Sequence, residues 1–152
     1  MMQLQFLLFG FLIGVMSCTN SIKHDEVLAG KRAVEFAEVA FVRQDVQRAY
    51  ALLSDRTKGY VPLEKFRETL LRLHPSGHPT SVAATEYEPM PGEKAMYIYI
   101  NGKNSAEPFE YTLTMDGTAA TDYKVSRIAR GSSSSYLPST SERKKFADPI
   151  QP

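Results

Sequence analysis

Between residues 79 and 131 the chain alternates apolar and polar side chains with a period of two. Segment 109–115 shows this best, because apolar residues occupy every second position and polar residues lie between them. Successive side chains of a strand point to opposite faces, so the pattern is typical of a strand with one buried face. Segments 95–100 and 123–128 repeat it, segment 80–88 does so more weakly, and turns containing Gly or Pro separate them. The four segments predict an antiparallel meander.

Before the meander, apolar residues recur every three or four positions, which is the period of an amphipathic helix. A first helix is expected to begin around residues 24–25, and a second after Asp45, whose side chain suits a helix N-cap. A third is expected over residues 63–73, opened by Pro62, with residues 54–61 forming a loop before it. The chain therefore places three helices ahead of four strands.

A sheet with one apolar face must be covered, and the preceding helices are the elements available to cover it. The class predicted is α+β, with three N-terminal helices packed on a four-stranded meander. The strand residues expected to face the helices are Met96, Ile98, Ile100, Phe109, Tyr111, Leu113, Met115, Tyr123 and Val125. The helix residues expected to meet them are Phe41, Tyr50, Phe66 and Leu70.

The chain begins with an apolar run over residues 6–16, which is too short to span a bilayer but has the length of a signal-peptide core. The sequence Val-Met-Ser-Cys at residues 15–18 resembles the lipobox of bacterial lipoproteins. That resemblance implies a signal peptide over residues 1–17, a tether over residues 18–24, and a Cys18 that carries a fatty acid such as palmitate. The alternatives are an ordinary secretory signal and an uncleaved anchor, in which Cys18 has no such role.

Removal of residues 1–17 leaves about 135 residues, enough for one domain with a sizeable core. We place this domain over residues 25–131 and expect residues 132–152 to form a disordered tail. The formal net charge is +1, and no segment is basic enough to indicate nucleic-acid binding. Because Cys18 is the one cysteine of the chain, no intrachain disulfide is expected.

The order of these elements resembles that of the nuclear transport factor 2-like (ketosteroid isomerase-like) family, which includes small bacterial lipoproteins. The likeness covers residues 25–130. It rests on the polar turn at residues 43–45, on the helix that follows over residues 46–53, and on the last strand at residues 123–128. The resemblance implies a curved sheet wrapped around the helices, with a cavity at the wide end of a cone.

In enzymes of that family the cavity holds a general base, usually a carboxylate or a histidine. The candidates for lining such a pocket here are Phe41, Tyr50, Phe66, Tyr111 and Tyr123. None of the expected inward residues is an acid or a histidine. Glu86, Glu88 or Glu110 could point inward only in a register that carries its apolar neighbours into water. No catalytic residue is therefore assigned, and an isomerase-like enzyme with an unidentified base stays the alternative.

His74 and His78 have the spacing of two metal ligands on one helical face, but Pro75 and Gly77 between them argue against a helix there. Both are interpreted as loop histidines, and neither a metal site nor a cofactor is predicted. The serine run at residues 132–135 lacks the frame of a nucleophile motif and is interpreted as linker.

If alternate residues of the meander point inward, the residues between them form the opposite face. That face would present Tyr97, Tyr99, Thr112 and Thr114, a set that suits a protein partner or a homodimer, or that simply covers backbone. The function expected is that of a non-catalytic envelope lipoprotein, attached to the membrane by its lipid, which binds a small apolar ligand or a protein partner. In a Gram-negative source the outer membrane is the favoured location, because Thr19 replaces the Asp that retains some lipoproteins at the inner membrane.

Overall fold

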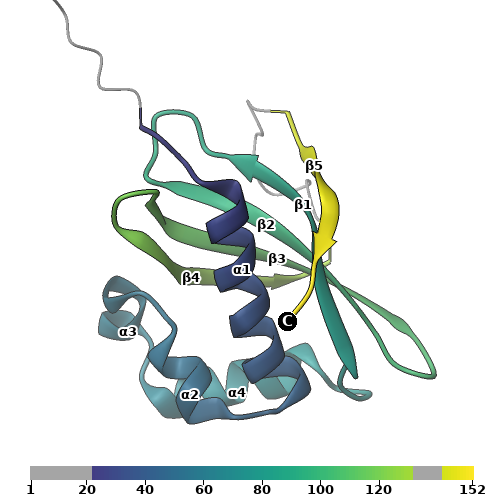
Figure 1. Ribbon diagram of the computed structural model, residues 1–152. Coiled ribbons are helices and arrows are strands. Elements are labelled where there is room, and N and C mark those ends of the chain that lie inside the picture. The colour runs from purple at the N-terminus through teal and green to yellow at the C-terminus, as the bar shows by residue number, and fades with distance from the viewer. Residues whose placement is uncertain (1–21, 132–141) are drawn as a thin grey trace, which may run out of the picture.

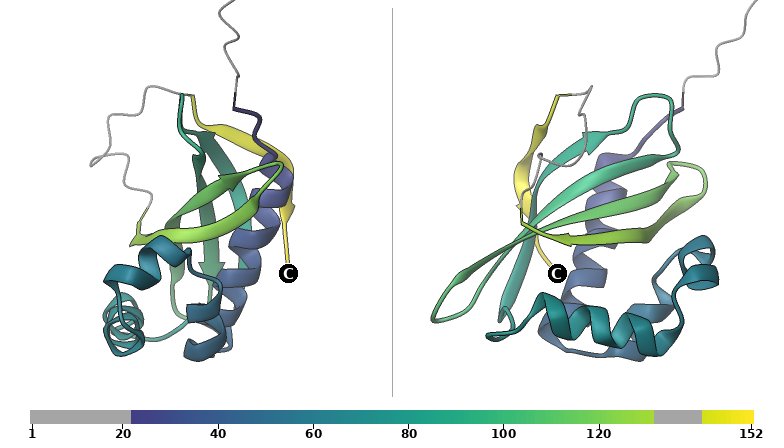
Figure 2. Two further views of the ribbon diagram at one scale, coloured as in Figure 1. Left: turned by 90° about the vertical axis from the view of Figure 1, so that its left-hand side faces the viewer. Right: turned by 180° about the vertical axis from the view of Figure 1, so that it is seen from behind.

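A computed structural model describes residues 22–131 and 142–152. Within these ranges, four α-helices and one π-helical turn pack on one face of a five-stranded antiparallel sheet (Figure 1). The predicted α+β class is confirmed, while the number of elements is larger than expected. Figure 2 shows α1 lying along the sheet and α2 to α4 gathered at one end of it.

The first helix, α1 (Glu26–Ala37), begins where the sequence predicts, because the Asp25 side chain accepts a hydrogen bond from the Leu28 amide at 2.9 Å. It continues into the π-helical turn η1 (Glu38–Val42). Phe36 and Phe41 on the apolar side of this combined helix are fully buried.

The second and fourth helices, α2 (Val46–Ala51) and α4 (Leu63–Leu73), confirm two further predictions, including the Asp45 cap and the bounds of the helix after Pro62. The loop predicted between them is wrong, because α3 (Asp55–Tyr60) forms there. Its N-cap Ser54 accepts a hydrogen bond from the Thr57 amide at 3.2 Å. α3 buries none of its residues, so its sequence carries no apolar period.

The strands are β1 (Ser81–Pro89), β2 (Ala95–Lys103), β3 (Pro108–Thr118), β4 (Asp122–Arg130) and β5 (Lys144–Ile150). Their order in the sheet is β4-β3-β2-β1-β5, so the predicted meander is extended by a strand beside β1. The prediction of a disordered tail is therefore wrong for Lys144–Ile150, and its part at residues 132–141 lies outside the described residues.

The core lies between the helices and the inner face of the sheet, as the alternation predicts. Every strand residue expected there is buried, and Leu113 and Met96 are completely inaccessible to solvent. Of the expected helix residues, Phe41, Phe66 and Leu70 are buried, whereas Tyr50 is half-buried. The period-two pattern thus gave the correct face for β2, β3 and β4, the three strands on which inward residues were predicted.

Candidate functional site

The outer face of the sheet, turned away from the helices, carries the predicted partner-face residues in two rows. Tyr97 lies directly opposite Thr114, and Tyr99 lies directly opposite Thr112. Residues opposite one another in an antiparallel pair share a face, so the four side chains form one array. The next strand, β1, places Glu88 beside Tyr97 and Glu86 beside Tyr99 in the same rows.

The two tyrosine rings of this array are buried rather than open to solvent. Tyr97 is 8% exposed and Tyr99 is 7% exposed, while Thr112 and Thr114 are half-buried. The two tyrosines therefore lie on the predicted face, but little of their ring area is exposed to solvent. On the far side of the first row, Arg127 lies opposite Thr114 and is exposed.

Tyr99 is the centre of a cluster of charged side chains on the outer face. Its hydroxyl donates a hydrogen bond to Glu88 Oε2 at 2.9 Å, and Glu88 itself is 4% exposed. The Arg143 guanidinium carbon lies 3.6 Å from the centroid of the Tyr99 ring, within the range of a cation–π contact. Arg143 Nη1 also lies 3.2 Å from Glu86 Oε2. The cluster joins β1, β2 and the chain just before β5.

The environment of this cluster keeps Tyr99 protonated. Burial, reinforced by the hydrogen bond to the Glu88 carboxylate, raises the pKa of Tyr99 above its ordinary value. Burial likewise raises the pKa of Tyr97, with Glu88 adding to the effect. Both hydroxyls therefore stay neutral donors at physiological pH.

A cavity of about 400 Å³ opens beside the Tyr99 cluster and is mainly polar. Its walls include Glu86, Glu110, Arg143 and Lys145 together with Tyr99. Paired acids and bases around a concave surface can accept a polar group of either charge from a partner. This combination is the most developed site among the described residues, and we take it as the candidate functional site.

The residues predicted to line a pocket make contacts within the protein, four of them in two aromatic pairs. The rings of Phe41 and Tyr111 stack with their centroids 4.3 Å apart, and those of Tyr50 and Phe66 are 5.7 Å apart. The Tyr123 hydroxyl accepts a hydrogen bond from the Asp25 amide at 2.9 Å and so ties β4 to the start of α1. Each of these five side chains is therefore engaged in a contact with another part of the protein.

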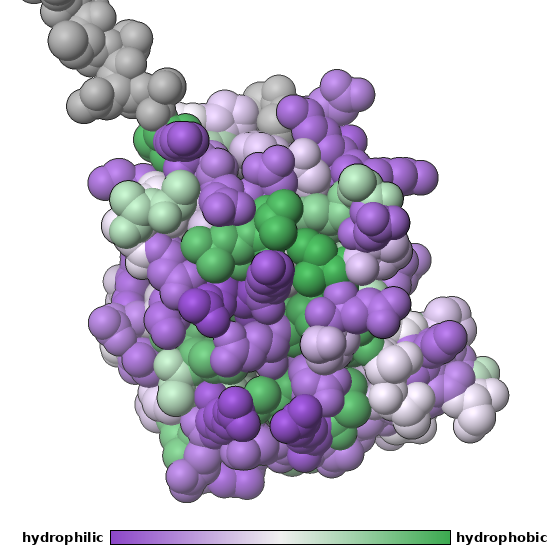
Figure 3. Space-filling model, in the orientation of Figure 1, coloured by the Kyte–Doolittle hydropathy of each residue, from purple (hydrophilic) through white to green (hydrophobic). Residues whose placement is uncertain are grey.

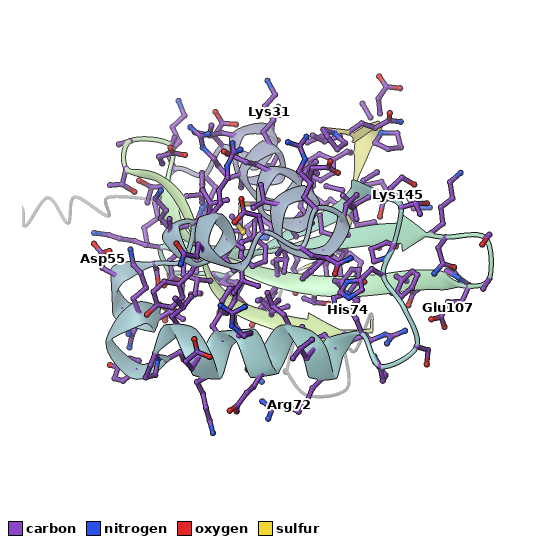
Figure 4. The ribbon with its side chains drawn as sticks, turned by 90° about the horizontal axis from the view of Figure 1, so that it is seen from below. Lys31, Asp55, Arg72, His74, Glu107 and Lys145 are labelled. Carbon is purple, nitrogen blue, oxygen red and sulfur yellow. The ribbon has the colours of Figure 1, made fainter. Side chains whose placement is uncertain are left out.

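His74 follows the last residue of α4, as predicted for a loop histidine, but its side chain lies in the core. It is 6% exposed and lies at the end of α4 under the sheet, whereas Arg72 of the same helix points away (Figure 4). His74 Nδ1 lies 2.9 Å from the Leu70 carbonyl oxygen, which can only accept, so Nδ1 carries the proton. Nε2 then accepts from the Tyr111 hydroxyl at 2.8 Å. Both nitrogens are satisfied by the protein.

The second histidine stacks on the first, with 4.4 Å between the ring centroids of His74 and His78. His78 Nδ1 lies 3.1 Å from the Phe41 carbonyl oxygen. The pair therefore closes one end of the core. Within residues 22–131 and 142–152, no group of three or more metal-ligating side chains could hold a metal ion.

Three residues of this description were missed by reasoning from the sequence: His74, Glu88 and Arg143. The alternation does place Glu88 on the outer face, but it does not indicate that the Glu88 side chain is buried there. Arg143 lies in a segment that was interpreted as tail, so its contact with Tyr99 had no signal in the sequence. Tyr111, whose hydroxyl donates to His74, is 37 positions away along the chain, so no local pattern in the sequence indicates their contact.

The described part of the chain is thus an α+β domain with a filled core and a polar cluster on the outer face of its sheet. None of its helices has the length and apolar character needed to cross a membrane. Comparisons with family models, with curated proteins and with solved structures each give no match.

Proposed function

We propose that this chain is a lipid-anchored protein of the bacterial cell envelope that binds a protein partner through the outer face of its sheet. The observation that carries the proposal is the Tyr99 cluster. It brings Glu86, Glu88 and Arg143 together beside a cavity of about 400 Å³ on a face that the helices leave uncovered. Tyr and Arg are enriched in the residues that dominate protein interfaces.

The anchor belongs to the same proposal and rests on the lipobox-like residues before Cys18, which precede the described residues. We also propose kinship with the nuclear transport factor 2-like cone. In support of it, helices precede an antiparallel meander and pack on one face of the sheet. A small ligand inside the cone is less well supported, because the rings of Phe41, Tyr111 and Phe66 lie where it would bind.

An isomerase-like enzyme is the second candidate, and the observation in its favour is a histidine inside the cone. Burial lowers the pKa of His74, so that the ring is neutral and has the protonation state of a base at neutral pH. However, the one ring nitrogen with a free lone pair already accepts from Tyr111. A base engaged in this way and packed among Phe41 and Phe109 serves the core rather than a substrate.

The proposal can be tested by photo-cross-linking in cells that produce the protein. A benzophenone amino acid at Glu110, which is exposed and lines the cavity, is expected to give a discrete cross-linked product of higher mass. The matched control is the same amino acid at Lys65, exposed on α4 on the opposite side of the sheet. A product from the Glu110 position that is no stronger than that from Lys65 would reject partner binding at this face.

A further inference from the structure

β5 and the residue before it contact both faces of the neighbouring sheet at β1. Before the strand begins, Arg143 reaches over the outer face to Tyr99 and Glu86. On the helix side, the ring of Phe146 packs on Tyr87 of β1 with 4.9 Å between the centroids. The segment 143–150 therefore contacts the sheet on both faces, and Figure 1 shows β5 lying along the edge of the sheet next to α1.

Gly30 allows Phe146 and Ile150 to pack closely on α1. A methyl group at Gly30 would overlap Ile150 Cδ1 and would lie 2.9 Å from Phe146 Cζ. Glycine inside a helix costs stability, so its presence in the middle of α1 has a packing reason. The missing side chain forms a notch in α1, and together with the side of β1 that pairs with β5 it makes a groove for an extended chain.

The backbone ladder between β5 and β1 is short. β5 forms three residue pairs with β1, whereas β1 and β2 form eight. Between the pairs Ala84–Ile150 and Glu86–Lys145, residues 146–149 of β5 face the single residue Thr85. Neither Phe146 nor Ile150 is fully buried. Backbone pairing alone therefore contributes little to holding β5 at this edge, and the side chains of Arg143, Phe146 and Ile150 supply the remaining contacts.

The seam between α1 and β5 is also incompletely filled. A cavity of about 400 Å³ runs along it, lined by Val34, Val39 and Ile150 under a rim of charged side chains. Hydrophobic surface is visible between the two elements in Figure 3. The groove therefore offers more apolar area than β5 covers.

We propose that the groove formed by the edge of β1 and the Gly30 notch is a strand-docking site that accepts β5 of a second copy of this chain. A strand that fits this groove needs a cation that contacts Tyr99 and Glu86. It also needs an aromatic ring three residues later and an aliphatic side chain four residues after that. Arg143, Phe146 and Ile150 meet this requirement, so every copy carries the matching strand. Exchange replaces each intrachain contact by the same contact between chains, and protein concentration decides the balance.

This docking uses the edge of the sheet, whereas the proposed function uses its outer face, and the two can fail independently. The test follows disulfide formation between two purified full-length chains that lack Cys18 through Cys18→Ala. One carries Glu86→Cys and the other carries Lys145→Cys, because these positions are direct partners in the ladder. Cross-strand partners have the Cβ separation that a disulfide needs.

After mild oxidation, the mixture is expected to contain disulfide-linked dimers of the two different chains in an amount that rises with concentration. The matched control replaces the Lys145→Cys chain by a Lys65→Cys chain, whose cysteine lies on exposed α4. We expect at least about fivefold more mixed dimer from the Glu86 and Lys145 pair than from this control. A chain with both Glu86→Cys and Lys145→Cys reports the intrachain disulfide of the closed form.

A second variant checks that docking uses the groove. Gly30→Leu in the chain that carries Glu86→Cys fills the notch, and is expected to reduce the mixed dimer to the level of the Lys65 control. A pair that gives no more dimer than the control at high concentration would overturn strand exchange. A mixed dimer insensitive to Gly30→Leu, in a chain whose circular dichroism is unchanged, would overturn it as well.

Discussion

At the scale of single residues, His74 shows how a polar side chain becomes part of a core. Its two ring nitrogens bond to Leu70 and Tyr111, and its ring packs among the rings of Phe41, Phe109 and His78. Burial lowers the pKa of His74, with the charges of His78 and Arg130 acting in the same direction. The neutral ring is therefore the form that the folded chain accommodates.

This lowered pKa predicts a loss of stability in mild acid. The unfolded chain takes up a proton at His74 as the pH falls through about 6.5, whereas the folded chain takes it up only at lower pH. The contribution of His74 is thus complete above the pKa of the unfolded chain and is lost as the pH falls toward that of the folded chain. His74→Gln cannot titrate, and is expected to flatten the decline in unfolding free energy between about pH 7.5 and 5.

Urea unfolding at several pH values measures this difference, which cannot exceed about 1.4 kcal/mol per pH unit for one group. Tyr111→Phe is the matched control, because it removes the hydroxyl but leaves His74 able to titrate. Parallel pH profiles for the unmodified chain and His74→Gln would show that His74 is not the group responsible.

At the scale of elements, the sequence predicted those segments that bury one face and missed those that do not. Four strands and three helices have clear periods because each has a face in the core. α3 buries none of its residues and β5 has no fully buried residue, so neither leaves a hydrophobic period. β5 also carries two lysines and Pro149, which are typical of an edge strand and equally of a solvated tail.

The candidate site was predicted in part for the same reason. Register alone places Tyr97, Tyr99, Thr112 and Thr114 on one face, and the structure agrees. Their burial depends on contacts from outside the meander, of which Arg143 over Tyr99 is one, and a period-two pattern holds no information about such contacts. Long-range pairings of this kind come from topology rather than from local sequence.

The register of β3 gives a test at this scale. Leu113 is fully buried, so Leu113→Ala is expected to lower the unfolding free energy by about 2 to 5 kcal/mol. Thr112 is half-buried on the other face and donates one hydrogen bond to the Gly131 carbonyl at 3.0 Å. Thr112→Ala is therefore expected to cost about 1 kcal/mol or less. Equal costs in urea unfolding would contradict the assignment of the two faces.

At the scale of the whole molecule, the described domain is one sheet with its helices on one side. α1 begins at Glu26, eight positions after Cys18, and its start is fixed to β4 through Tyr123. In the proposed lipoprotein this short spacing would keep the domain close to the bilayer. The outer face and the β1 edge would then be presented to partners in the same membrane.

The proposed anchor makes a prediction for the intact protein. Metabolic labelling with an alkyne fatty acid in the producing cells is expected to mark the chain, and Cys18→Ala is expected to abolish the label. Cys18→Ser serves as a second removal of the thiol. A mature chain that is unlabelled and begins at a residue other than Cys18 would contradict lipidation.

The strand order of the sheet also has a consequence for biosynthesis. β5 follows all other elements in the chain, yet it pairs with β1, the first strand. A ribosome or a secretion channel releases the polypeptide from its N-terminal end, so the helices and the first four strands can collapse before residues 142–152 emerge. During that interval the hydrogen-bonding groups along one side of β1 have no neighbouring strand, and they can recruit a nascent chain or a chaperone.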